Sequence, residues 1–98
     1  MERLSEEEIN KELNNLPEWK RLDEKWIERK YQFQNYLNGI RFVDQAAEYA
    51  ENKKHHPFIS IDYKMVKLKI SSWQAKGLTD LDFEMVKQFD ELYEKAKK

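Results

Sequence analysis

The chain has 98 residues, no cysteine, and 18 Lys and Arg against 19 Asp and Glu. This length suits one small domain, and we expect residues 1–98 to form it. The formal net charge of −1 disfavours nucleic acid or an anionic membrane as a default partner. The missing cysteines exclude disulfides and thiolate chemistry. The sequence starts without a signal-peptide pattern, and no run reaches the roughly 20 apolar residues of a membrane span, so we expect a cytoplasmic protein.

The first third of the sequence predicts a short helix followed by a β-hairpin. Ser5 and Glu8 have the spacing of a capping box, which marks a helix N-terminus. Pro17 prevents the helix from continuing, because the residue before a proline avoids the α conformation. Residues 19–22 and 25–33 are extended segments on either side of a polar pair, and the second alternates apolar and polar side chains.

A second helix is predicted to start after Asn35, a favourable N-cap, and to end before Pro57. Its apolar residues recur three or four positions apart and predict one buried stripe. The stripe comprises Tyr36, Ile40, Val43, Ala47 and Ala50.

Two more strands and a last helix complete the predicted order. Residues 58–63 and 66–71 alternate in the manner of half-buried strands, with a tight turn near Lys64. Thr79 is placed to cap the last helix, and Asp82 falls in its first turn. We therefore predict an α+β fold, helix-strand-strand-helix-strand-strand-helix, with a four-stranded antiparallel sheet packed by helices on one face. Solvent or a partner would cover the other face.

The only two histidines, His55 and His56, are adjacent and precede Pro57 at a helix-to-strand junction. Imidazoles titrate near neutrality, which suits acid–base catalysis. By themselves they are better explained as ordinary polar residues at a helix end, stabilised by the helix dipole. Adjacent histidines converge poorly on one ion and no cysteine is present, so we expect no metal site.

Trp73 is the second unusual residue, because strand alternation places it on the polar side of its strand. One interpretation is an aromatic wall for a planar ligand or a subunit contact. The other is that the strand ends at Ser71, so that the alternation no longer applies.

Several of these residues together resemble the signature of the pterin-4a-carbinolamine dehydratases. The matching positions are Glu51, His55-His56-Pro57, Tyr63, Trp73 and Asp82, with a weaker match at Trp19 in the first half of the chain. The resemblance implies dehydration of 4a-hydroxytetrahydropterin to quinonoid dihydropterin, which recycles pterin after an aromatic amino acid hydroxylase has used it. It also implies a pterin substrate, no cofactor and no metal.

The resemblance further implies catalytic roles for His55, His56, Glu51 and Asp82. The histidines would exchange protons with the substrate, Glu51 would orient His55, and Asp82 would orient a histidine or contact the pterin. Substrate-binding roles fall on Trp73, Pro57, Tyr63 and Trp19. Animal members of the family have a third histidine where this chain has Trp73, so the division of labour in a three-histidine site does not transfer.

Two other functions fit parts of the sequence. A catalytically weak relative could act as a protein-binding, dimerisation or assembly factor, because the family includes such proteins. A small nucleic-acid binder could use Lys64, Lys67 and Lys69 with Trp73 as a stacking platform, although the charge balance opposes this. A short chain buries a modest share of its surface, and the family resemblance implies subunits, so a homodimer or homotetramer is expected.

Overall fold

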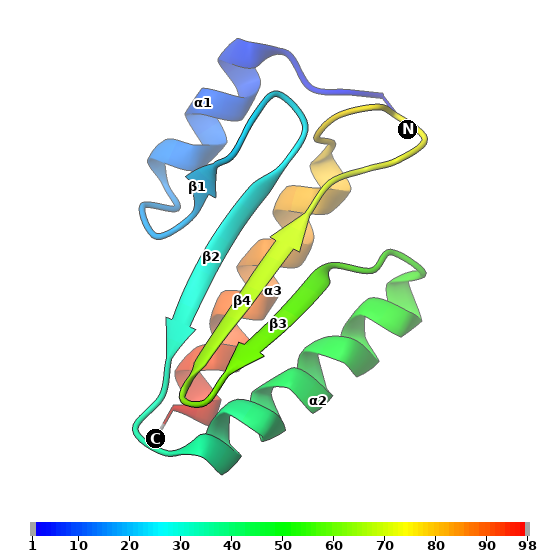
Figure 1. Ribbon diagram of the computed structural model, residues 1–98. Helices are drawn as coiled ribbons and strands as arrows, with labels where there is room; N and C mark the ends of the chain where they lie inside the picture. The colour runs from blue at the N-terminus through cyan, green and yellow to red at the C-terminus, as the bar shows by residue number, and fades with distance from the viewer. Residues whose placement is uncertain (1, 98) are drawn as a thin grey trace.

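The computed structural model describes residues 2–97 and contains three helices and four strands in the predicted order (Figure 1). The elements are α1 (Glu6–Asn14), β1 (Lys20–Arg21), β2 (Ile27–Gln32), α2 (Tyr36–Lys53), β3 (Phe58–Asp62), β4 (Met65–Ile70) and α3 (Asp80–Ala96). All strand pairs are antiparallel, and the sheet order is β1-β2-β4-β3. The predicted α+β class is confirmed.

The helix starts follow from the predicted caps. Ser5 Oγ accepts from the Glu8 amide, and the Glu8 carboxylate accepts from the Ser5 amide, which completes the capping box of α1. Asn35 caps α2 by accepting from the Asn38 amide. At the other end of α2, Lys54 adopts a left-handed conformation with φ of 55° and turns the chain out of the helix.

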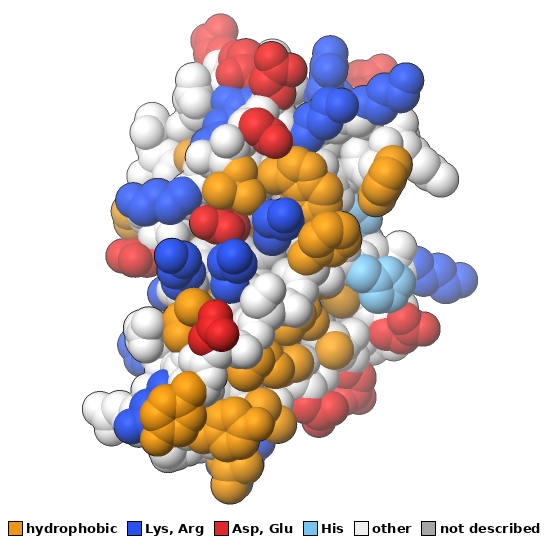
Figure 2. All heavy atoms as spheres, viewed as in Figure 1, with side chains coloured by type: hydrophobic (Ala, Val, Ile, Leu, Met, Phe, Trp, Pro, Cys, Tyr) orange, Lys and Arg blue, Asp and Glu red, His pale blue; other side chains and the backbone are white. Residues whose placement is uncertain are grey.

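The central strands β2 and β4 carry the sheet side of the core. Val66, Leu68 and Ile70 are fully buried and alternate with half-buried residues of β4, as predicted. The edge strand β3 is mostly exposed, so the prediction of two half-buried strands holds better for β4 than for β3. Figure 1 shows α3 behind the sheet, and Figure 2 shows lysines and apolar side chains together on the opposite side. Within residues 2–97, no helix is long and apolar enough to cross a membrane.

The predicted apolar stripe of α2 was partly wrong. Ala50 is buried as predicted, but Tyr36 and Ala47 are exposed. Phe42 and Ala46 take the centre of the buried face instead, each 0% exposed. The Phe42 ring packs on Tyr31 and determines which face of α2 points inward, because burial of this larger side chain stabilises the fold more than burial of Ala47 would.

A polar network anchors α3 to the sheet. Asp90 accepts hydrogen bonds from Trp19 Nε1 at 3.1 Å and from Tyr31 Oη at 2.6 Å, and it pairs with Arg29 at 2.9 Å. The Arg29 guanidinium also lies 4.4 Å from the centre of the Tyr31 ring. The network links α3 to β2 and to the segment before β1.

Above pH 10, Tyr31 is expected to make the fold lose stability. Burial raises the pKa of Tyr31, and the nearby Asp90 carboxylate raises it further. The pKa of Tyr31 is higher in the folded chain than in the unfolded chain, where it is near 10. The stabilisation by the neutral Tyr31 hydroxyl is therefore complete below pH 10. Above pH 10 the free energy of unfolding falls by up to about 1.4 kcal/mol per pH unit. Urea unfolding between pH 9 and 11 measures this loss in wild type and in Tyr31→Phe. The free energy of unfolding of Tyr31→Phe should fall less steeply with pH, and equal slopes for the two proteins would contradict the prediction.

Candidate active site

His55 and Asp82 form a largely buried pair between the α2–β3 connection and α3. The His55 Nε2 atom lies 2.7 Å from Asp82 Oδ1, and the two side chains are 17% and 0% exposed. A carboxylate oxygen accepts, so Nε2 is the donating nitrogen in this contact. The other ring nitrogen, Nδ1, has no hydrogen-bond partner within residues 2–97.

The second oxygen of Asp82 is fixed from several sides. Asp82 Oδ2 accepts from Ser72 Oγ at 2.6 Å and from the Thr79 amide at 2.9 Å. Ser72 Oγ also lies 3.0 Å from Thr79 Oγ1 and 3.3 Å from His55 Nε2. A carboxylate with this many partners has one orientation, so Asp82 holds the His55 ring firmly.

His56 has a different carboxylate partner. Its Nε2 atom lies 2.8 Å from Glu51 Oε1, and both side chains are exposed. The prediction that Glu51 orients His55 was therefore wrong, because Glu51 pairs with His56 and Asp82 pairs with His55. The reason is the left-handed Lys54, which takes His55 off the helical path, so that His56, five residues after Glu51, meets it instead.

Both histidines line one cavity of about 450 Å³. Ligand pockets have volumes of about 300–1,000 Å³, so the space suits a small bicyclic ring. Its other lining residues are Lys53, Lys54, Phe58, Ser71, Ser72, Trp73, Gln74, Ala75 and Leu81. We call this space the histidine pocket. Within residues 2–97, no three His, Asp or Glu side chains gather in a way that could hold a metal ion.

Trp73 lines the histidine pocket from a loop. The strand β4 ends at Ile70, and an isolated bridge between Ser72 and Gly77 closes the loop that holds Trp73. Strand alternation therefore does not apply to Trp73. Its side chain is 81% exposed, which leaves most of an aromatic surface available beside the histidines.

The structure brings some predicted substrate-binding residues to the pocket and leaves others elsewhere. Pro57 is buried next to His56. Tyr63 lies in the turn at the far end of β3, 68% exposed and stacked on Tyr36. Trp19 is 3% exposed and bonded to Asp90. Trp73 therefore lines the histidine pocket, whereas Pro57, Tyr63 and Trp19 do not.

Ser72 was not among the predicted site residues, whereas Thr79 was predicted as the cap of the last helix and matches the family signature. Ser72 bonds the Asp82 carboxylate directly, and Phe58 forms part of the pocket wall. The signal for Ser72 was present, because two serines in succession follow a strand of alternating apolar residues. A polar side chain at such a position, when buried, needs a partner.

Glu51→Gln is expected to have a modest effect on the chemistry of this site. The Glu51–His56 pair is exposed, and exposed pairs contribute about 0.2–1 kcal/mol, which corresponds to a loss in kcat/KM of about 1.4- to fivefold. Glu48→Gln, an exposed change on the same helix, is the matched control. Steady-state rates of the pterin dehydration that the sequence resemblance implies measure both variants; a loss of more than a hundredfold for Glu51→Gln would contradict the account.

Comparisons with known proteins agree on one family. The family model described as pterin 4 alpha carbinolamine dehydratase matches residues 2–92. A Picosynechococcus protein provisionally named as such a dehydratase is 40% identical, covering 92% of this chain and 97% of its own. An Aquifex aeolicus protein with the same provisional name is 36% identical, over 92% of this chain and 90% of its own.

Solved structures give the same result. The crystal structure of a transcriptional coactivator/pterin dehydratase from Brucella melitensis superposes with a TM-score of 0.87 at 32% identity, over 93% of this chain and 98% of that one. A pterin dehydratase-like protein described as a RuBisCO assembly factor in the alpha-carboxysome has a TM-score of 0.67 at 17% identity, over 76% of this chain and 88% of that one, and so shares the fold. This chain belongs to the pterin 4 alpha carbinolamine dehydratase family.

Proposed function

We propose that the protein is a hydro-lyase that converts 4a-hydroxytetrahydropterin to quinonoid dihydropterin and water. The observation that carries the proposal is that two carboxylate-paired imidazoles line one ligand-sized cavity. Membership of the dehydratase family supports the same reaction. The pathway served would be pterin recycling after an aromatic amino acid hydroxylase, in the cytoplasm.

The reaction needs two proton transfers. The bond between carbon 4a and the hydroxyl oxygen breaks as that oxygen gains a proton and leaves as water. The adjacent ring nitrogen loses its proton, and its electron pair forms the new carbon–nitrogen double bond. One proton enters and one leaves, so imidazoles that titrate near neutrality can supply both steps.

His55 and His56 are proposed to carry these transfers. Each has a carboxylate at Nε2, and for each the Nδ1 atom, which forms no hydrogen bond within residues 2–97, would exchange protons with the substrate. Asp82 and Glu51 would fix ring orientation and stabilise the protonated imidazole. Trp73 and Phe58 would border the pterin and exclude water from it.

The proposal is tested by measuring dehydration of 4a-hydroxytetrahydropterin that a hydroxylase generates in the cuvette. Wild-type protein should accelerate the reaction well above its spontaneous rate, and a known pterin dehydratase serves as the positive control. If the positive control accelerates the reaction and this protein does not, the proposed activity is wrong.

Partner binding is the second candidate function. It is favoured by Trp73, whose ring is largely exposed and offers apolar area for contact with another protein. The RuBisCO assembly factor that shares this fold is an example of such a role in another protein. A protein of this kind would tolerate the loss of both histidines. Its function would then be independent of dehydration.

A homodimer or homotetramer is also proposed. Strand β3 is an unpaired sheet edge, and Phe58, Ile61 and Tyr63 are 54%, 42% and 68% exposed along it and its turn. Exposed apolar side chains on an open edge favour pairing with another chain. Sedimentation equilibrium over a range of concentrations should give a mass above that of the monomer; a monomer at every concentration would contradict this.

A further inference from the structure

We infer that a second cavity beside the histidine pocket binds an anionic group carried on the side chain of the pterin. The cavity has a volume of about 490 Å³ and is lined by Lys25, Trp26, Ser71, Ser72, Trp73 and Lys76. We call it the lysine groove. The inference rests on the proposed function and extends it to the class of pterin.

The lysine groove and the histidine pocket are neighbours. Ser71, Ser72 and Trp73 line both cavities, so the Trp73 loop forms their common boundary. A ligand with its ring beside His55 could therefore extend a substituent past Trp73 into the groove. The two spaces together suit a bicyclic ring with a side chain.

The electrostatics of the two cavities favour an anion. Lys25 and Lys76 line the groove, and Lys53 and Lys54 line the histidine pocket, whereas no Asp or Glu of residues 2–97 lines either cavity. Lys53 is paired with Glu84. Within the same described range, Lys25, Lys54 and Lys76 form no ion pair with a carboxylate. The excess of cations contrasts with the whole chain's formal net charge of −1.

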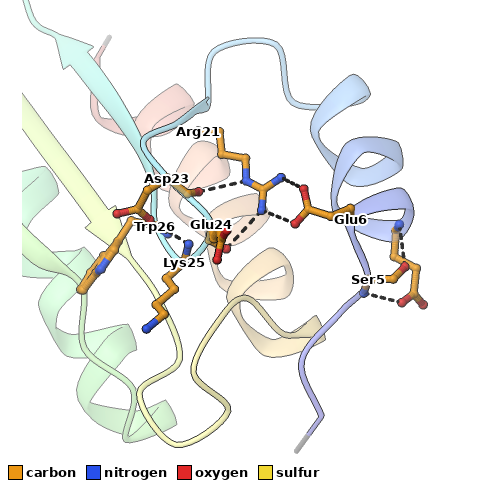
Figure 3. Close-up of polar contacts among 8 residues, drawn as sticks. Ser5, Glu6, Arg21, Asp23, Glu24, Lys25 and Trp26 are labelled. Carbon is orange, nitrogen blue, oxygen red and sulfur yellow. Dashed lines mark hydrogen bonds and ion pairs between the residues drawn. The ribbon is translucent and has the colours of Figure 1, made fainter.

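The turn that presents Lys25 and Trp26 is firmly built (Figure 3). Asp23 Oδ1 accepts from the Lys25 amide at 2.8 Å and from the Trp26 amide at 3.0 Å. Arg21 donates to the carbonyl oxygens of Asp23 and Glu24 and binds both carboxylate oxygens of Glu6 at 2.7 Å. Figure 3 shows Arg21 directed towards α1, with Lys25 and Trp26 directed away from it. A preorganised loop of this kind lowers the entropic cost of binding.

Trp26 gives the groove an aromatic wall that continues towards the histidine pocket. Its ring centre lies 5.0 Å from that of Phe58, which lines the histidine pocket. Lys69 Nζ lies 4.9 Å from the centre of the Trp26 ring and adds another cation to this area. The site therefore offers apolar area for a side chain and positive charge for its end. Carboxylate and phosphate share the required chemistry.

The test compares binding of three pterins by quenching of their fluorescence. The probes are neutral biopterin, folic acid, which carries carboxylates, and neopterin monophosphate. Wild-type protein should bind at least one anionic pterin about two- to thirtyfold more tightly than biopterin at low salt, which is the range that two exposed ion pairs contribute together. The preference should shrink as NaCl is raised. The stronger of the two anionic probes distinguishes carboxylate from phosphate.

Lys25→Gln/Lys76→Gln should abolish the preference for the anionic probes over biopterin. Lys11→Gln/Lys30→Gln removes the same amount of charge from exposed positions outside both cavities. This control variant should keep the preference for the anionic probes. If biopterin binds but the anionic probes bind no better, or if both double variants behave alike, the inference is wrong and the proposed function stands. If no pterin binds and no dehydration is seen, both fail together.

Discussion

Asp82→Ala is expected to lower the free energy of unfolding by about 3 kcal/mol and to remove most dehydratase activity. The side chain is 0% exposed and accepts from Ser72, from the Thr79 amide and from His55. Truncation leaves these buried donors without partners, and loss of one member of a buried pair is costly. For a domain of this size the melting temperature should fall by about 12–24 °C.

Two comparisons separate the structural and chemical roles of Asp82. Asp80→Ala changes an exposed carboxylate in the first turn of the same helix and should alter stability by no more than about 0.5 kcal/mol. Asp82→Asn keeps the shape and should retain more stability than Asp82→Ala, with activity still reduced because an amide stabilises a protonated imidazole poorly. Equal melting temperatures for Asp82→Ala and Asp80→Ala would contradict the account.

His55→Ala is expected to lower the enzyme-catalysed dehydration rate by about 10²–10⁴-fold, the range typical of a general acid or base. His56→Ala should also lower it, because the proposed reaction needs a proton donor and a proton acceptor. Rates above the spontaneous background measure both variants, with circular dichroism and thermal melting to establish that they are folded.

His55→Gln and Asn52→Ala serve as controls for this prediction. Gln can still donate to Asp82 but cannot exchange a proton at neutral pH, so its rate should be as low as that of His55→Ala. Asn52 is exposed on α2 and lies outside the histidine pocket, so Asn52→Ala should behave as wild type. A folded His55→Gln variant with wild-type rate would show that His55 acts only by its hydrogen bond.

Local features of the fold were predictable because neighbouring residues determine them. The Ser5–Glu8 capping box, the Asn35 cap and the alternation of β4 involve residues close together in sequence. The inward face of α2 was less predictable. Its apolar residues form a wide band, and packing of Phe42 against Tyr31, a contact between distant segments, decides which side is buried.

The candidate site shows the same limit more clearly. The histidine pair, Asp82 and Trp73 stand out by type and spacing, but their contacts depend on the assembled fold. His55 and Asp82 are 27 residues apart in sequence, and they meet because α3 packs beside α2, from whose end His55 extends. Glu51 pairs with His56 because Lys54 adopts a left-handed conformation after the helix. The hydrogen bond from Ser72 to Asp82 forms because the loop that holds Trp73 folds back on itself.

The most direct test of the central claim is the dehydration rate of the folded His55→Ala/His56→Ala double variant beside wild type. Binding of biopterin is measured on the same samples. We predict that wild type accelerates dehydration and that the double variant falls to the spontaneous rate while it keeps its fold and still binds pterin. A folded double variant that dehydrates the substrate as fast as wild type would contradict catalysis by the histidine pair.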